Sequence, residues 1–284
     1  MPSPALVRRG FFGAGLVVAI VDALAVRVTI SNSLVFVVMP HRIREKVGVG
    51  RTALSSRAMD DDPDFTRRFG GIDRLYGPGA LARAAAAHVV VIGIGGVGSW
   101  AVEALARSGI GQLTLNDQDH VAESNMNRQI HALESTLGAA KVVAMRERIT
   151  AINPRCELVC IEQFIDEENI ATLLPACDAV IDAIDNVRAK AALIAYCCRA
   201  GIRIVTTGGA GGRMDPTRTE VIDLARTVQD ALASKVRARL RKEYGFSRDP
   251  KKKFGVECVF SQEPILRPAS SDTCALPVDG AAGL

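Results

Sequence analysis

The stretch that decides the fold is His88-Val89-Val90-Val91-Ile92-Gly93-Ile94-Gly95-Gly96-Val97-Gly98. Its first five residues form a short run rich in valine, as expected of a central strand that is buried on both faces of a parallel sheet. Apolar residues then recur at helical spacing up to the stop signal Gly109, at Val97, Ala101, Val102 and Leu105. The sequence therefore predicts a strand, a glycine-rich turn and a helix over residues 97–108.

The glycine-rich turn places backbone N–H groups at the start of this helix. These groups and the helix dipole can receive phosphate oxygens, so the turn predicts a nucleotide site with Gly93, Gly95, Gly96 and Gly98 as its binding residues. The next apolar run, residues 112–116, ends at Asp117, where an acidic side chain can bond a ribose hydroxyl. This position suits NAD as well as ATP, and a tight turn without a ligand is the simpler alternative.

The segment after Asp117 separates ATP chemistry from hydride transfer. It contains Asn125-Met126-Asn127-Arg128-Gln129, followed by Lys141 at the head of a helical segment and by Val180-Ile181-Asp182-Ala183-Ile184-Asp185-Asn186. This order resembles the ubiquitin-activating-like, or ThiF/MoeB-like, adenylating enzymes. The resemblance implies that ATP is bound by Asp117, Asn125, Arg128, Gln129, Lys141 and Asp185, and that Arg128, Lys141 and Asp185 are catalytic.

The charges of these residues fit adenylation. A triphosphate needs cations to hold it and to stabilise the departing pyrophosphate, and Arg128 and Lys141 would supply them. Asp185 follows a buried strand and would hold Mg2+ between the phosphates. Taken singly, these residues have simpler roles as surface cations or a helix cap, and Asn125 as a turn residue. Asp182 lies on the opposite face of extended chain from Asp185, so only Asp185 is assigned a role.

Longer stretches resemble one branch of the family, the tRNA threonylcarbamoyladenosine dehydratases. They lie between about Arg67 and about Cys274, and include residues 68–77, 127–132, 190–197, 206–212 and 255–261. The resemblance implies an α/β, Rossmann-like doubly wound fold whose mainly parallel sheet has an added antiparallel C-terminal portion. It also implies ATP-dependent dehydration (cyclisation) of threonylcarbamoyladenosine in tRNA, next to the anticodon, by adenylation of the threonyl carboxylate.

Two other functions stay open. One is an adenylyltransferase that activates the C-terminus of a ubiquitin-like or sulfur-carrier protein. Such members carry two C-x-x-C pairs that bind structural zinc, and because this sequence has none we expect no zinc site. The other is an NAD-binding or non-enzymatic Rossmann protein, which Arg128, Lys141 and Asp185 disfavour.

A tRNA substrate requires a surface that faces phosphates. Residues 235–253 are strongly basic, and Arg239, Arg241 and Lys252 are candidate tRNA contacts, although such a run is more commonly a solvated helix and loop.

Cys258 lies in a family-like motif, where a thioester role competes with the commoner role of a strand cysteine in the core. The resemblance also implies a homodimer and a cysteine desulfurase as sulfur-transfer partner. We expect no DNA partner.

Composition places the chain among globular proteins, with 48% hydrophobic and 23% charged residues. The net charge of +4 permits a polyanionic partner without requiring one. Seven cysteines without a C-x-x-C pair favour reduced thiols over a disulfide framework. We therefore expect a cytoplasmic protein.

Residues 1–58 differ from the rest. An apolar run at residues 11–25 follows Arg8-Arg9 and resembles a signal peptide, but it is interrupted by Asp22 and is too short to span a membrane. Because export does not suit an ATP-dependent enzyme, we interpret residues 1–58 as an atypical extension, non-native or disordered, with Met59 as the natural start. Residues 59–284 would be the ThiF-like nucleotide-binding catalytic domain, truncated at its C-terminus. Some relatives carry a membrane-associating C-terminal helix, so membrane association is only a weak expectation.

Overall fold

The computed structural model describes residues 27–31, 34–38 and 63–266. Its main feature is a seven-stranded sheet with the strand order β5-β4-β3-β6-β7-β9-β8. The strands are β3 (His88–Ile92), β4 (Gln112–Asn116), β5 (Glu157–Ile161), β6 (Ala179–Asp182), β7 (Ile204–Thr207), β8 (Thr219–Asp223) and β9 (Glu257–Ser261). Neighbouring strands are parallel except β8 and β9, which are antiparallel. The predicted mainly parallel sheet with an antiparallel C-terminal portion is confirmed.

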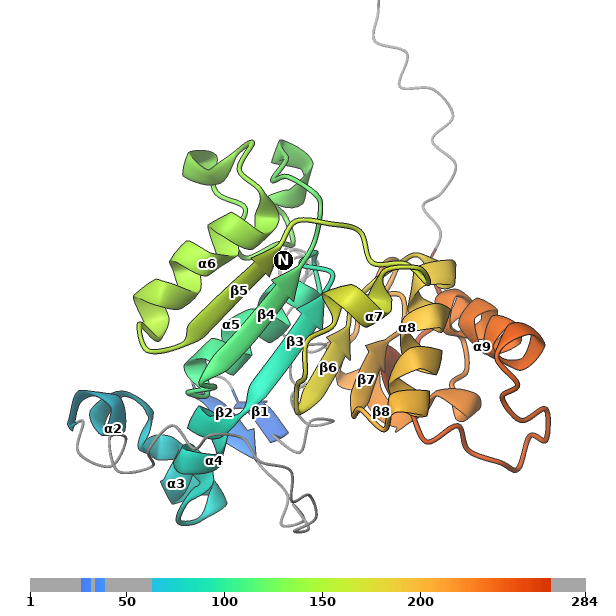
Figure 1. Cartoon of the computed structure of the whole chain (residues 1–284), viewed down its shortest axis with the longest axis horizontal. Helices are drawn as coiled ribbons and strands as arrows, with labels where there is room; N and C mark the ends of the chain where they lie inside the picture. Colours follow the sequence, from blue (N-terminus) through green and yellow to red (C-terminus); the bar gives the residue numbers. More distant parts are fainter. Residues whose placement is uncertain (1–26, 32–33, 39–62, 267–284) are drawn as a thin grey trace, which may run out of the picture.

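Helices cover both faces of the sheet (Figure 1). They are α5 (Gly98–Arg107), α6 (Lys141–Ile152), α7 (Ile170–Leu173), α8 (Val187–Ala200) and α9 (Ala231–Glu243). Strand β3 is buried along its whole length: Val89 and Val91 join one core with α5 and α6, while Val90 and Ile92 join a second core with α7, α8 and α9. The valine-rich run is therefore a central strand, as predicted, because both of its faces are covered.

The chain path creates a crevice at the carboxyl edge of the sheet. From β3 the chain builds β4 and β5 on one side, and then crosses back to place β6 and β7 on the other. Open α/β sheets bind ligands where the strand order reverses in this way, outside the carboxyl ends of the strands. The turn that begins at Gly93 and the loop that carries Asp185 follow β3 and β6, so both lie at this reversal.

Three short helices precede the sheet: α2 (Pro63–Phe69), α3 (Gly71–Tyr76) and α4 (Ala80–Ala86). They share a small core of their own that includes Phe65, Phe69 and Leu81. Figure 1 shows them at the end of the sheet opposite the carboxyl edge. Single turns of 3-10 helix occur at Glu123–Asn125, Glu134–Thr136, Pro216–Arg218 and Leu224–Arg226.

Strands β1 (Arg27–Ser31) and β2 (Leu34–Val38) form a separate antiparallel pair. Both fall within residues 1–58, which the sequence suggested to be an atypical extension. The signal-like run at residues 11–25 and the predicted start at Met59 lie outside the described residues. Within the described parts of the chain, no helix combines the length and apolarity needed to cross a membrane.

Candidate active site

A cavity of about 1030 Å3 opens at the carboxyl edge of the sheet, at the upper end of the size range of small-molecule sites. Its walls are the glycine-rich turn and the loops that follow β4, β5, β6 and β7. Nine of the ten predicted nucleotide-binding residues line it: Gly93, Gly95, Gly96, Asp117, Asn125, Arg128, Gln129, Lys141 and Asp185. The chain thus brings together residues from three separate segments, which follow β3, β4 and β6.

Gly98 is the tenth predicted residue, and it is not part of the cavity wall. It is the first residue of α5, and a Cβ atom there would collide with the carbonyl oxygen of Gly93. Gly93 itself has a φ of 87°, and a Cβ on it would lie 2.7 Å from the carbonyl oxygen of Ala183. Gly98 therefore acts by letting the start of α5 pack closely against the ends of β3 and β6, as the last glycine of such turns does.

Asp117 braces the turn from the neighbouring strand. One carboxylate oxygen accepts a hydrogen bond from the N–H of Ile94 at 2.6 Å, and the other accepts one from the N–H of Asp119 at 2.9 Å. The carboxylate also lines the cavity, where a ribose hydroxyl could reach it. No side chain caps α5 at Val97, so N–H groups at the start of this helix are available to a phosphate.

The two predicted cations differ in their surroundings. Lys141 begins α6, its side chain is only 7% exposed, and its Nζ lies 2.7 Å from a carboxylate oxygen of Asp119. The simpler interpretation of Lys141 as a surface cation is therefore wrong. Arg128 is exposed at the cavity, its aliphatic chain lies beside Gly96, and its Nη1 donates to the carbonyl oxygen of Ser124 at 2.6 Å. Both residues thus line one cavity, Arg128 from the segment after β4 and Lys141 from the first turn of α6.

Asn125 and Gln129 are buried and line the same cavity. The Asn125 side chain accepts a hydrogen bond from the N–H of Ala122 at 3.1 Å, so it also holds the turn, as its simpler interpretation suggested. The Oε1 atom of Gln129 has no hydrogen-bond partner among the described residues. A buried carbonyl oxygen of this kind can accept a hydrogen bond from a ligand.

Asp182 and Asp185 have separate environments, as predicted. Asp182 is fully buried, whereas Asp185 is exposed and lines the cavity. The interpretation of Asp185 as a helix cap is wrong, because Asn186 caps α8 by accepting hydrogen bonds from the N–H groups of Arg188 and Ala189. The described residues contain no cluster of three His, Cys, Asp or Glu side chains that could hold a metal ion. Mg2+ commonly binds through one carboxylate together with substrate phosphates, so Asp185 alone fits that role.

Sequence reasoning missed a buried ion pair beneath Asp185. The Lys190 Nζ lies 2.9 Å from a carboxylate oxygen of Asp182, and donates to the carbonyl oxygen of Ile184 at 2.9 Å. Thr206 donates to the same Asp182 carboxylate at 2.6 Å. Lys190 begins one of the family-like stretches, residues 190–197, but a lysine in a helix normally suggests a solvated position, so the sequence did not indicate a buried ion pair. The ion pair fixes the turn that leads from β6 to Asp185.

The structure corrects the role considered for Cys258. This residue lies on β9, is fully buried, and does not line the cavity. Burial raises the pKa of its thiol to about 12, which keeps the sulfur protonated and unreactive. The covalent role is therefore wrong, because a nucleophilic thiol must be accessible and ionised.

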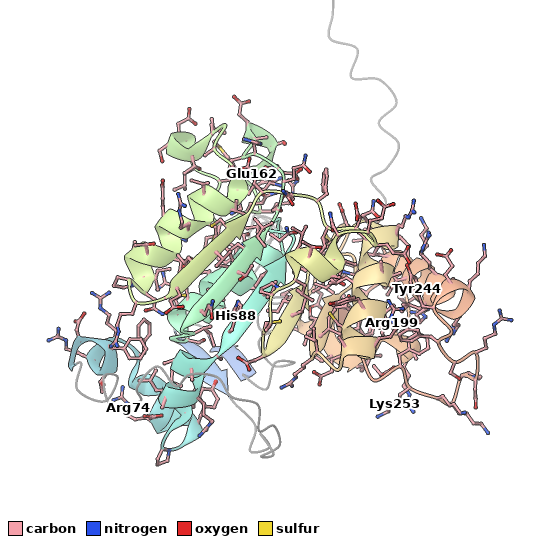
Figure 2. All side chains as sticks on the ribbon, viewed as in Figure 1. Arg74, His88, Glu162, Arg199, Tyr244 and Lys253 are labelled. Carbon is pink, nitrogen blue, oxygen red and sulfur yellow. The ribbon has the colours of Figure 1, made fainter. Side chains whose placement is uncertain are left out.

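Two of the three predicted tRNA contacts are engaged within the protein. Arg239 is paired with Glu243 at 2.7 Å, while Arg241 lies over the ring of Phe254 and donates to the carbonyl oxygen of Ser247. Lys252 is exposed. Figure 2 shows its neighbour Lys253 at the periphery of the molecule. The exposed cations of this segment are Lys235, Lys242, Arg248, Lys251, Lys252 and Lys253.

Comparison with known proteins assigns the chain to a family. The model of the ThiF family matches residues 71–243, which is more than half of the chain. The chain belongs to the ThiF family. Within this family it is 53% identical to the tRNA threonylcarbamoyladenosine dehydratase of Haemophilus influenzae over 213 residues, or 75% of this chain and 82% of that protein.

Other ThiF-family relatives differ in how similar they are to this chain. The crystal structure of the Escherichia coli tRNA N6-threonylcarbamoyladenosine dehydratase in complex with ATP has 53% sequence identity and a TM-score of 0.71, and the match covers 73% of this chain and 86% of that one. The molybdopterin-synthase adenylyltransferase of Escherichia coli is more distant, with 37% identity over 45% of this chain and 51% of that protein. This ThiF-family chain therefore lies in the tRNA threonylcarbamoyladenosine dehydratase branch.

Proposed function

We propose that this chain is an ATP-dependent dehydratase that cyclises threonylcarbamoyladenosine in tRNA, next to the anticodon. The observation that carries the proposal is the cavity at the carboxyl edge of the sheet, which the glycine turn, Arg128, Lys141 and Asp185 line together. The relatives that bear this enzyme's name match three quarters of the chain, and one of them was solved with ATP.

In this proposal different residues of the cavity wall bind different parts of ATP. The glycine turn receives phosphate oxygens through backbone N–H groups, and Asp117 contacts the ribose. Arg128 and Lys141 offset the charge that develops on pyrophosphate as it leaves. Asp185 would hold Mg2+, which neutralises phosphate charge when bound.

The reaction then has two balanced steps. A threonyl carboxylate oxygen attacks the α-phosphorus of ATP, the bond from that phosphorus to the bridging oxygen breaks, and pyrophosphate leaves. A nucleophile already within the substrate next attacks the acyl carbon, AMP departs with the former carboxylate oxygen, and one proton is released. Intramolecular attack has a high effective concentration, so no protein nucleophile is needed. The inert thiol of Cys258 is consistent with such a route.

The tRNA would lie along the basic segment that starts in α9. Its exposed cations Lys242, Arg248 and Lys252 can contact phosphates without breaking internal contacts, whereas Arg239 and Arg241 cannot. The homodimer and the cysteine desulfurase partner remain predictions from the resemblance. ATP and tRNA are cytoplasmic reactants, so we place the reaction in the cytoplasm.

The decisive experiment is mass spectrometry of tRNA nucleosides after incubation of the protein with ATP, Mg2+ and tRNA that carries threonylcarbamoyladenosine. We expect a mass loss of one water, together with one AMP for each nucleoside changed. Asp185→Asn should lower the rate by about 100-fold. The exposed Glu162, which does not line the cavity, gives the matched control Glu162→Gln, with an unchanged rate.

Two results would contradict the proposal. No ATP consumption with modified tRNA would exclude the dehydratase. ATP–pyrophosphate exchange that responds to a small protein ending in Gly-Gly, and not to tRNA, would favour the adenylyltransferase alternative instead.

A further inference from the structure

Arg213 is a buried cation in the wall of the same cavity. It follows the glycine-rich segment 208–212 that leads out of β7, and only 4% of its surface is exposed. Its Nη2 donates to the carbonyl oxygen of Gln229 at 2.7 Å. Its Nε and Nη1 atoms are buried and have no hydrogen-bond partner among the described residues. Donors of a charged group are rarely left unpaired in this way.

The surroundings hold the Arg213 guanidinium in one orientation. A carboxylate oxygen of Asp230 lies 3.8 Å from Nη2, and the same carboxylate accepts hydrogen bonds from the N–H groups of Gly209 and Ala233. The carboxylate of Glu263 accepts from the N–H groups of the two residues after Arg213, at 2.9 and 3.0 Å. These contacts anchor the backbone on both sides of the side chain.

Gln229 supplies the carbonyl that orients Arg213, and its backbone is unusual. Its φ is 55°, and it is the one non-glycine residue of the described chain with a positive φ. Such conformations cost energy and persist where the surrounding structure enforces them, often at functional sites. The strained residue thus helps to direct Nη2 toward the protein and leaves the Nε and Nη1 donors for another group.

The position of Arg213 separates it from the phosphate-binding groups. The glycine turn, Lys141 and Asp185 follow β3, β4 and β6, whereas Arg213 belongs to the segment after β7. An acyl adenylate has a phosphate at one end and an acyl group at the other. With the phosphate on the glycine turn, the β7 side of the cavity is left for the acyl end.

We propose that Arg213 binds the carboxylate of the second substrate through the donors that have no partner within the described residues, Nε and Nη1. The guanidinium can give a carboxylate oxygen a charge-assisted hydrogen bond from either donor. It would hold one oxygen while the other attacks the α-phosphorus of ATP. During ring closure the same donors would stabilise the negative charge on the acyl oxygen. This inference rests on the proposed function, since it names the residue that receives the threonyl carboxylate.

The first test measures the tRNA reaction in variants of Arg213. Arg213→Gln should lower kcat/KM for modified tRNA by about 100-fold, because the charged donors are lost. Affinity for ATP should stay within about threefold, as expected when the group removed contacts the other substrate. Arg213→Lys keeps the positive charge beside Asp230, and its kcat/KM should lie between the values of the wild type and of Arg213→Gln. Arg218→Gln, at an exposed position outside the cavity, is the matched control. Thermal unfolding and ATP titration establish that each variant folds.

The second test does not depend on tRNA. N-carbamoyl-L-threonine reproduces the reacting end of the proposed substrate, and its amide lacks the carboxylate. With α,β-methylene-ATP present, the wild-type protein should bind the acid in preference to the amide, and Arg213→Gln should lose that preference.

The two tests separate the two proposals. Binding of the acid that depends on Arg213, in a protein that does not act on modified tRNA, would remove the proposed function and leave this inference standing. The inference is overturned if the acid binds equally to the wild type and to Arg213→Gln, or to neither. It is also overturned if a folded Arg213→Gln keeps the full kcat/KM for modified tRNA.

Discussion

Glycine serves two different purposes in the turn after β3. A Cβ on Gly98 would strike the carbonyl oxygen of Gly93, whereas a Cβ on Gly95 would enter open space in the cavity. One residue is therefore required for folding of the turn and the other for access of a ligand. This distinction comes from the backbone geometry, since both positions fit the same sequence motif.

Alanine substitutions should separate these purposes. Gly98→Ala should lower the free energy of unfolding by about 1–3 kcal/mol, as overpacked sites do. Gly95→Ala should keep the wild-type stability and weaken ATP binding, because its methyl group occupies the phosphate space. Urea unfolding and ATP titration measure the two effects. Equal stability of the two variants would contradict this assignment.

His131 gives a prediction about pH. Burial, together with the nearby charges of Lys141 and Arg148, lowers the pKa of His131 to about 4. The unfolded chain, with a pKa near 6.5, binds the proton first as the pH falls, so this histidine makes the protein less stable between pH 6.5 and pH 4. At pH 5 the loss should be about 2 kcal/mol relative to neutral pH.

The variant His131→Phe should remove that part of the pH dependence. Both ring nitrogens of His131 are buried and have no hydrogen-bond partner within the described residues. Phenylalanine fills the site without such nitrogens. The free energy of unfolding in urea, measured at pH 7.5 and pH 5, is the readout. A variant that loses as much stability as the wild type between these values would show that other groups carry the effect.

The buried ion pair of Lys190 and Asp182 connects three secondary-structure elements. It links α8 to β6, and through Thr206 to β7. Lys190→Met should cost about 3–5 kcal/mol, because an uncompensated carboxylate stays buried. The double variant Lys190→Met, Asp182→Leu should recover much of that loss, since apolar pairs often replace buried ion pairs at little cost.

Urea unfolding of both variants tests this linkage. A double variant no more stable than Lys190→Met would contradict it. ATP titration of the folded double variant adds a second readout, because the turn that leads to Asp185 is held by the lysine. Weaker ATP binding at restored stability would show that the pair positions the turn as well as stabilising the fold.

The elements differ in how far the sequence predicted them. Strand β3 and helix α5 carry clear periodicities, and the observed bounds agree with the predicted residues to within one position. The nucleotide-binding residues could be chosen because a family motif orders them along the chain. Lys190 and Arg213 could not be found in this way. Their importance comes from burial and from partners distant in sequence, and an isolated lysine or arginine in a sequence suggests solvent.

For the whole molecule, the distribution of exposed charge matters more than the net charge. Lys242 and Lys252 are exposed, whereas Arg239 and Arg241 serve internal contacts. We expect Lys242→Ala and Lys252→Ala each to weaken tRNA binding and to reduce the slope of log affinity against log salt by about 1. Arg239→Ala should act mainly on stability.

Filter binding at several salt concentrations measures these slopes. The exposed Arg83, which lies on α4 at the opposite end of the sheet, provides the control Arg83→Ala. A slope that changes as much in Arg83→Ala as in the lysine variants would contradict a tRNA surface on the segment after α9.

The antiparallel pair β8 and β9 has a consequence for the covalent continuity of the chain. These strands are neighbours along five registered positions, yet the chain between them leaves the sheet to form α9 and the exposed loop around Lys252. Strand β9 is also paired with β7 on its other side. Cleavage of the loop by trypsin would therefore yield two fragments that stay associated, because β9 would remain hydrogen-bonded to β7 on one edge and to β8 on the other. The shorter fragment would then be held by non-covalent contacts alone. After denaturation and refolding, a synthetic peptide with the sequence of β9 could take its place.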